Sequence, residues 1–175
     1  MIEAFKKAVE QNKDRIYSMA YYSLGNREEA EDVTQEVLVR LWENWEDIAV
    51  ERVTGWVVHV TRNACIDAIR KRQTYRRRIT ASGDGEIVER AASGWPGPDE
   101  LAHASALRQQ LQVAIQEIDE PYRSLIILRE IEDMKYGEIS EAMNMPLNTV
   151  KTYIHRGRKM LRGQLKETWK NEPKE

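Results

Sequence analysis

Hydrophobic residues recur at helical spacing along much of the chain, and the pattern is clearest in residues 134–165. In this stretch Ile139 and Ala142 share one helical face. Asn144 follows, and asparagine readily adopts the left-handed backbone conformation with which many helices end. Pro146 disfavours a helical conformation in the residue before it and can itself begin a new helix. The pattern therefore predicts two helices joined by a tight turn.

The second of these helices has one apolar side and one polar, basic side. The apolar side repeats at roughly 100° per residue, and it comprises Val150, Ile154, Gly157, Leu161 and Leu165. The other side comprises Asn148, Thr152, His155, Arg156, Lys159 and Arg162. Between Glu141 and Glu167 the chain has six basic residues and no acidic one. Such a helix suits the major groove of DNA, so we predict a helix-turn-helix. The alternative is a hairpin with a solvated charged side, but a solvated face normally mixes both signs of charge.

The rest of the pattern predicts helices in both halves of the chain. In the first half we expect helices at residues 2–24, 27–45 and 55–72, with a loop at residues 46–54. In the second half, one helix should end near Asp119 and another should start at Pro121. The first of these helices has an apolar stripe of Leu107, Leu111, Ile115 and Ile118, and the core candidates of the second are Leu125, Ile126, Leu128 and Ile131.

A stretch rich in glycine and proline separates the two halves. Residues 81–100 contain four glycines together with Pro96 and Pro98, a composition that favours a flexible linker. We place the linker at residues 76–104, between a helical domain at residues 1–75 and a helix-turn-helix domain at residues 105–170. The predicted fold class is therefore all-α, with two small helical domains joined by a flexible linker.

The helix predicted at residues 27–45 has an outer side typical of protein interfaces. Its expected core residues are Ala30, Val33, Val37 and Leu41. On the opposite side Val39 and Trp42 lie among carboxylates, and interfaces commonly combine apolar anchors with a polar rim. The alternative is that Trp42 folds back onto its own domain or packs against the second one. The pattern alone favours neither.

The helix predicted at residues 55–72 has a polar face suited to unpaired bases. This face comprises Trp56, His59, Arg62, Asn63, Asp67 and Arg70. Such side chains can stack on bases, hydrogen-bond to their edges and neutralise phosphates. The alternative is a solvated face with a weak Asp67–Lys71 pair at helical spacing.

Charge is distributed unevenly along the chain, although the net charge is only −2. Residues 27–51 contain nine acidic and two basic residues, whereas residues 70–78 contain six basic residues and no acidic one. Opposite blocks on one chain suggest two partners, one of them polyanionic. The single cysteine, Cys65, excludes an internal disulfide and a zinc-finger cluster.

Other classes of protein find little support in the sequence. No apolar run approaches the roughly 20 residues needed to cross a bilayer, and no signal-like start precedes the first helix. We therefore expect a soluble, cytoplasmic protein without membrane insertion. There is no nucleophile–base pairing, phosphate loop or paired metal ligand, and the three histidines, His59, His103 and His155, lie far apart in sequence. We expect no catalytic residue, no metal, no cofactor and no enzymatic activity.

Taken together, these segments resemble an extracytoplasmic-function sigma factor of the sigma-70 family, a compact two-domain class of bacterial transcription initiation factor. The resemblance extends from about Phe5 to Leu165. Its most specific pieces are AEDVTQEVLVRLW (30–42), GWVVHVTRNACIDAIRKR (55–72), PYRSLIILREIEDMKYGEISEAM (121–143) and MPLNTVKTYIHRGRKML (145–161). Four such pieces in this order, around a variable linker, make the resemblance strong.

The resemblance implies three groups of binding residues. The residues implied to bind core RNA polymerase are Asp32, Gln35, Glu36, Val39, Arg40 and Trp42. Those implied to read the −10 promoter element, together with the loop at 46–54, are Trp56, His59, Arg62, Asn63, Asp67 and Arg70. Those implied to read the −35 element as duplex are Asn148, Thr149, Lys151, Thr152, His155, Arg156 and Lys159. His59 replaces a common Arg or Tyr, and Asn148 replaces a common Gly, so the preferred promoter sequence does not follow from the resemblance.

The resemblance also implies the function and the partners. The protein would direct RNA polymerase to promoters by recognising the −35 and −10 elements and melting the latter. Its partners would be core polymerase, promoter DNA and an anti-sigma factor. Two other classes remain for comparison. A response regulator would need parallel strands and an acidic phosphorylation pocket, but the first half of the chain shows no alternating βα pattern. A protein-interaction module would leave both basic surfaces without a role.

Overall fold

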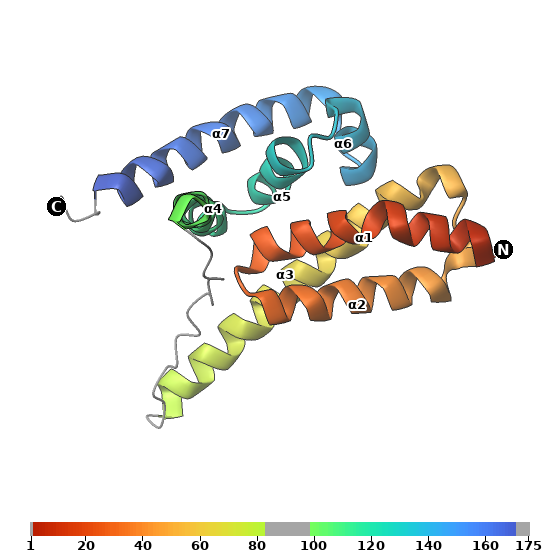
Figure 1. Ribbon diagram of the computed structural model, residues 1–175, viewed down its shortest axis with the longest axis horizontal. Coiled ribbons are helices and arrows are strands. Elements are labelled where there is room, and N and C mark those ends of the chain that lie inside the picture. Colours follow the sequence, from red (N-terminus) through yellow and green to blue (C-terminus); the bar gives the residue numbers. More distant parts are fainter. Residues whose placement is uncertain (1, 83–98, 171–175) are drawn as a thin grey trace.

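The computed structural model describes residues 2–82 and 99–170 of the 175-residue chain. Within these ranges it has helices and no strand, which confirms the all-α prediction (Figure 1). The elements in chain order are α1 (Ile2–Leu24), α2 (Arg27–Glu43), η1 (Trp45–Asp47), η2 (Val50–Arg52), α3 (Val53–Ser82), α4 (Asp99–Gln116), α5 (Tyr122–Ile126), η3 (Ile127–Ile131), α6 (Tyr136–Met143) and α7 (Leu147–Lys170). The middle of the predicted linker, residues 83–98, lies outside the described residues.

The first lobe, residues 2–82, is a bundle of α1, α2 and α3. The predicted core face of α2 is confirmed, because Ala30, Val33, Val37 and Leu41 are all buried. Gly25 ends α1 with a φ of 69°, and the side chain of Asn26 accepts a hydrogen bond of 3.0 Å from the backbone N–H of Glu29. A glycine with positive φ followed by an N-capping asparagine stops one helix and starts the next. These two local signals fold α2 back along α1.

Helix α3 is longer than the sequence pattern predicted. It has 30 residues and ends at Ser82, seven residues beyond the predicted domain boundary at residue 75. Arg72 anchors it to the turn between α1 and α2, since its guanidinium donates to the Glu29 carboxylate and to the backbone carbonyl of Leu24. Beyond Arg72 the helix leaves the bundle, and residues 73–78 are exposed (Figure 1).

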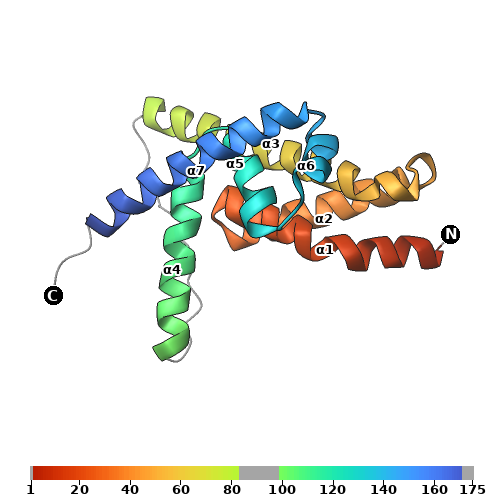
Figure 2. The same cartoon turned by 90° about the horizontal axis from the view of Figure 1, so that it is seen from above.

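The second lobe, residues 99–170, packs α4, α5, η3 and α6 against α7. Its core includes Ile115, Ile118, Leu125, Ile126, Ile127, Leu128, Ile139, Val150 and Ile154. Leu107, at the start of the predicted apolar stripe, lies outside the core, because its side chain is 57% exposed. Figure 2 shows the reason: the N-terminal part of α4 extends away from the other helices, so its apolar stripe continues past the end of the core.

The two lobes pack directly on one another. Met19 of α1 and Val58 of α3 are buried in the apolar cluster of the second lobe. Gln112 of α4 is 1% exposed, and its side chain donates a hydrogen bond of 3.1 Å to the backbone carbonyl of Tyr21. A buried amide needs such a partner, because leaving it unpaired costs about 1–3 kcal/mol. The contact between the lobes is therefore packed like the interior of a protein. A flexible linker between the two domains does not require such a specific contact.

Two ion pairs cross the same interface. Arg15 contacts Glu132 and Arg62 contacts Glu120, each at 3.5 Å between the guanidinium Nε and a carboxylate oxygen. All four side chains are at most 25% exposed, and the two Nε atoms are buried without a hydrogen bond within the described residues. Desolvation offsets much of the attraction in such pairs. We infer that the apolar contacts hold the lobes together and that the two carboxylates mainly neutralise the charge of the partly buried arginines.

Substituting Gly157 by alanine should destabilise the second lobe. A Cβ at this position would lie 2.7 Å from Cγ1 of Ile126, in the contact between α7 and α5, and overpacking of this kind costs about 1–3 kcal/mol. Gly163→Ala is the matched control, because nothing lies within 4 Å of its Cβ position. Alanine there should stabilise the helix by about 0.5–1 kcal/mol. Urea unfolding of both variants measures the difference, and equal stabilities would contradict the close packing at Gly157.

Candidate functional site

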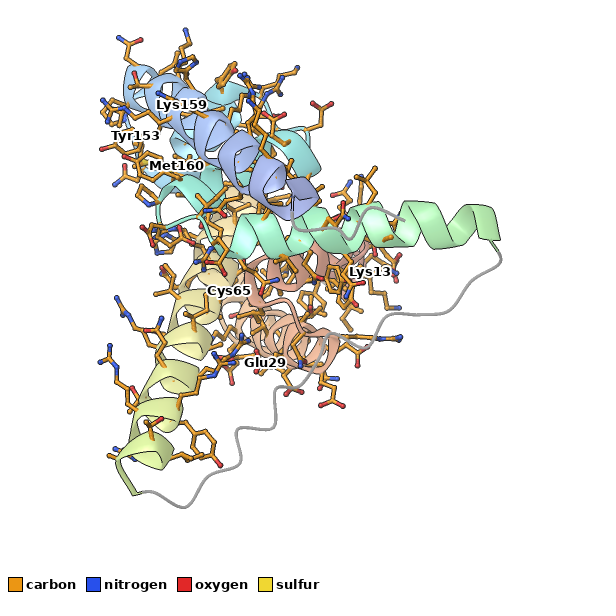
Figure 3. All side chains as sticks on the ribbon, turned by 90° about the vertical axis from the view of Figure 1, so that its left-hand side faces the viewer. Lys13, Glu29, Cys65, Tyr153, Lys159 and Met160 are labelled. Atoms are coloured by element: carbon orange, nitrogen blue, oxygen red, sulfur yellow. The ribbon has the colours of Figure 1, made fainter. Side chains whose placement is uncertain are left out.

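The turn and the recognition helix predicted in the second lobe are present. Helix α6 ends at Met143 and is capped by Asn144, whose φ is 49°, and α7 begins at Leu147. The inner face of α7 is buried through Val150, Ile154 and Gly157. On the outer face Asn148, Lys151, Thr152, His155, Arg156 and Lys159 are exposed, and Thr149 is half-buried. The predicted −35 residues thus share one surface of α7, on which Figure 3 labels Lys159. Their contact with DNA stays a prediction.

This surface keeps most of its positive charge. Arg158 forms an ion pair of 2.7 Å with Glu130 of η3. Of the six basic residues between Glu141 and Glu167, Arg158 is the one that forms an ion pair within the part of the chain that the structure describes. Arg156 and Lys159 are exposed on the outer side. Their charges are therefore available for phosphate contacts, which supply much of the affinity of DNA-binding proteins.

Helix α2 exposes the apolar pair predicted to anchor a protein partner. Val39 is 56% exposed and Trp42 is 55% exposed. Trp42 also contacts the bundle, because its ring packs edge-to-face on Phe5 with centroids 4.9 Å apart. Around the pair, Asp32, Gln35 and Glu36 are exposed, and Arg40 is paired with Glu36 at 2.5 Å. One part of Trp42 thus packs on its own domain, and the other part remains available to a partner.

The six residues predicted to read the −10 element fall into two groups in the structure, one open to solvent and one in contact with protein. Four of them, His59, Asn63, Asp67 and Arg70, lie on the open side of α3. His59 Nε2 and Asn63 Nδ2 are 3.0 Å apart, and Arg70 contacts Asp67 at 3.7 Å instead of the Asp67–Lys71 pair that the alternative interpretation required. These side chains form a continuous polar stripe.

The other two residues of this set, Arg62 and Trp56, contact protein. Arg62 is paired with Glu120 of the second lobe, as described above. Trp56 is half-buried against the core of the first lobe. The sequence offered no signal for Glu120 or for the equivalent Glu132, because nothing in the chain relates either carboxylate to an arginine of the first lobe. Their role emerges only from the packing of the two lobes.

A groove of about 1010 Å³ lies between the loop that precedes α3 and helix α6. Trp56 borders it on the side of the first lobe. Its charged lining consists of four carboxylates and two guanidiniums, from Asp47, Glu51, Glu138, Glu141, Arg15 and Arg52. An excess of negative charge repels phosphate. The present arrangement of the lobes therefore disfavours a nucleic-acid backbone beside this loop.

The chemistry of the remaining polar groups is limited. Burial raises the pKa of the Cys65 thiol to about 12, and its hydrogen bond with Ser23 offsets only part of this rise. The thiol therefore stays protonated at neutral pH and is a poor nucleophile. Residues 2–82 and 99–170 contain no group of three His, Cys, Asp or Glu side chains placed to hold a metal ion. None of the helices in these ranges is both long enough and apolar enough to span a membrane.

Comparison with known proteins identifies the family. Residues 8–75 match the family model of Sigma-70 region 2, and residues 108–161 match that of Sigma-70, region 4. The chain is 34% identical over 169 residues to the ECF RNA polymerase sigma factor SigW of Bacillus subtilis, and the match covers 94% of this chain and 90% of the relative. The chain belongs to the family of extracytoplasmic-function sigma factors.

Other relatives agree with this assignment. The chain is 33% identical over 162 residues to the ECF RNA polymerase sigma factor SigE of Mycolicibacterium smegmatis, covering 93% of this chain and 62% of that longer relative. Among solved structures, the sigma factor RpoE of Bartonella quintana in complex with the anti-sigma factor NepR has a TM-score of 0.67 at 20% identity, covering 93% of this chain and 96% of that one. CnrH in complex with the cytosolic domain of CnrY also has a TM-score of 0.67 at 20% identity, covering 95% and 90%. Both similarities concern the fold.

Proposed function

We propose that this sigma-family protein recruits RNA polymerase to promoters, with a separate surface for each of its three tasks. Helix α2 binds core polymerase, α3 and the loop before it open and read the −10 element, and α7 reads the −35 element as duplex. The observation that carries the proposal is the separation of charge and apolar surface between α2 and α7. Exposed Val39 and Trp42 lie among carboxylates on α2, whereas the outer face of α7 is basic and polar.

The −35 step depends on α7 entering the major groove. Long basic and short polar side chains alternate along its outer face, and such a mixture can contact phosphates and base edges together. Each good base-edge contact supplies about 1–3 kcal/mol of discrimination. The buried face of α7 fixes the helix on the second lobe, so these side chains approach the groove from a rigid platform.

The −10 step requires a base to leave the DNA stack. Unstacking costs a few kcal/mol, and stacking on an aromatic side chain offsets about 1–3 kcal/mol per base. Trp56, beside the groove and at the start of α3, is the aromatic group placed for this role. His59 and Asn63 follow it along the exposed stripe of α3 and offer hydrogen bonds to base edges or to the backbone.

The arrangement of the lobes must change before the −10 element is read. Arg62 is engaged by Glu120, and Glu138 and Glu141 of α6 line the groove beside the −10 loop. Separation of the lobes would release the arginine and remove the carboxylates from this loop. We propose that polymerase binding selects the open arrangement, because only that arrangement exposes all the −10 residues.

Removing the Glu120 carboxylate should increase the affinity of the free protein for single-stranded −10 DNA. Glu120→Ala frees Arg62 and weakens the closed arrangement, and a shift of this population should raise the affinity roughly 3- to 10-fold. Fluorescence anisotropy with a labelled oligonucleotide measures it. The control is Glu117→Ala, which removes an exposed carboxylate of the same segment. If the two variants change the affinity equally, the change reflects net charge alone. If Glu120→Ala has no effect, Glu120 does not keep Arg62 from binding DNA.

We also propose that the protein acts in the cytoplasm, without bond chemistry of its own, and that an anti-sigma factor controls it. Two solved structures with a similar fold are the sigma factor RpoE in complex with the anti-sigma factor NepR and CnrH in complex with the cytosolic domain of CnrY. Their overall fold matches that of this chain, which supports a related mode of control.

Run-off transcription with purified core polymerase tests the proposal. The protein should direct initiation at a subset of promoters in a genomic library, and core polymerase alone should not. Mutation of either promoter element should abolish the transcript. A different class of DNA regulator would bind duplex DNA without conferring initiation on core polymerase, and an interaction module would do neither. Either of these results would refute the proposed function.

A further inference from the structure

The first residue of α7, Leu147, is an exposed apolar side chain at the edge of the surface that we assign to the −35 element. It lies three residues before Val150 and seven before Ile154, and residues at these intervals share one side of a helix. Val150 and Ile154 are fully buried, yet Leu147 is 40% exposed. The apolar stripe of α7 therefore continues past the end of the core, and its first member faces solvent.

Leu147 also begins a row of residues that we assign to DNA. Residues four apart on a helix are neighbours, and Lys151 and His155 follow Leu147 at this interval. Both are exposed, and both belong to the group implied to read the −35 element. Single exposed leucines are common on protein surfaces, but this one lies at the N-terminal end of a recognition helix, the part that contacts base edges. The family resemblance assigned Asn148 to DNA and left Leu147 without a role.

The turn before Leu147 is held by hydrogen bonds and by packing. The hydroxyl of Ser140 donates to the backbone carbonyl of Met145 at 2.6 Å, and the backbone N–H of Met145 donates to the carbonyl of Ser140 at 3.0 Å. The side chain of Met145 packs against the core of the second lobe. The backbone that leads into α7 is therefore fixed, so Leu147 approaches DNA from a defined position.

An apolar side chain in the major groove matches one feature of the bases, the C5-methyl group of thymine. Lys151, His155 and Asn148 form hydrogen bonds through their polar groups, whereas the side chain of Leu147 cannot donate or accept one. Contact with a methyl group removes apolar surface of both partners from water. A polar base edge placed against Leu147 would lose its water without gaining a hydrogen bond. The side chain therefore favours thymine at the position that it meets.

We propose that Leu147 reads a thymine of the −35 element through the C5-methyl group of that base. This inference rests on the proposed role of α7 at the −35 duplex. The contact involves no phosphate and no charge, so it affects which sequence is bound and leaves the salt dependence of binding unchanged.

Deoxyuridine tests this contact, because it pairs as thymidine does and lacks the C5-methyl group. The probe is the −35 duplex that the full-length protein selects from a randomised duplex library, with its thymines replaced by deoxyuridine one at a time. Fluorescence anisotropy measures the affinity of wild type, Leu147→Ala and Met160→Ala for each duplex. Met160→Ala is the matched control, because Met160 is 42% exposed on the same helix but lies 13 residues further on, about 20 Å along the axis.

One of the deoxyuridine substitutions should weaken wild-type binding about 4-fold, as expected for one methyl-sized group removed from water. Leu147→Ala should bind the thymine duplex about 4-fold more weakly or worse, and the same deoxyuridine should then cause no further loss. Met160→Ala should respond to deoxyuridine as wild type does, and the salt slope should be equal for all three proteins.

Two results would overturn the inference: no single deoxyuridine weakens wild-type binding, or the loss caused by deoxyuridine is the same in Leu147→Ala as in wild type. The second result would assign the methyl contact to another side chain. A different result would refute the proposed function itself. If the protein selects no preferred sequence from the library, α7 does not read a −35 element.

Discussion

A variant carrying Val39→Asp and Trp42→Asp should lose most of its affinity for core RNA polymerase while keeping its helical fold. Both side chains are more than half exposed on α2, and buried aromatic anchors at interfaces contribute about 2–4 kcal/mol each when truncated. Two carboxylates in place of these anchors would also remain unpaired in the contact. We expect a loss of about 100-fold or more, measured by co-purification and by titration of labelled protein with core polymerase.

The structure defines the control and the limit of this experiment. Leu107→Asp introduces the same kind of change at a side chain that is 57% exposed on α4, and polymerase affinity should hardly change. The Trp42 ring also packs on Phe5, so the double variant should lose about 0.5–1.5 kcal/mol of stability. Circular dichroism and urea unfolding monitor that loss. If the double variant is folded and still binds core polymerase with wild-type affinity, α2 is not part of the interface.

Replacing Arg156 and Lys159 by alanine should weaken binding to −35 duplex about 10- to 100-fold near 0.1 M salt and reduce the salt slope by about 2. Both residues are exposed on the outer face of α7. Each released counterion contributes to the salt dependence, so loss of two phosphate contacts should change the slope as well as the affinity. Anisotropy with duplexes that contain or lack the −35 element measures both quantities.

Arg158→Ala is the matched control on the same helix. Its guanidinium is held by Glu130 at 2.7 Å, with both side chains 36% exposed. Its loss should cost at most about 1 kcal/mol of stability and leave the slope close to that of wild type. If the double variant and Arg158→Ala change DNA binding alike, the effect is one of net charge, and the specific role of the outer face is refuted.

Local structure followed from residues close together in the chain. Apolar residues three and four apart predicted the buried faces of α2 and α7, because one helix turn brings such positions to the same side. Asn144 with Pro146 predicted where one helix ends and the next begins, because caps depend on a few neighbouring backbone groups. The family resemblance also rests on contiguous segments.

The tertiary structure decided which side chains remain available. Periodicity relates a residue to its own helix and does not say which other element covers it. Arg62 and Arg70 therefore looked alike in sequence, yet Arg62 meets Glu120 across the lobe interface while Arg70 stays on the open stripe of α3. Leu107 fitted the core pattern but lies beyond the end of the core.

The sequence by itself determined the helices, their caps, their apolar faces and the family to which the protein belongs, since each depends on short-range spacing or on contiguous motifs. Only the tertiary structure decided that the lobes share an interface, that this interface engages part of the −10 face, and that α3 projects its basic end beyond the bundle. These properties depend on contacts between residues far apart in the chain, such as Arg15 with Glu132 and Gln112 with Tyr21. No local pattern encodes such contacts.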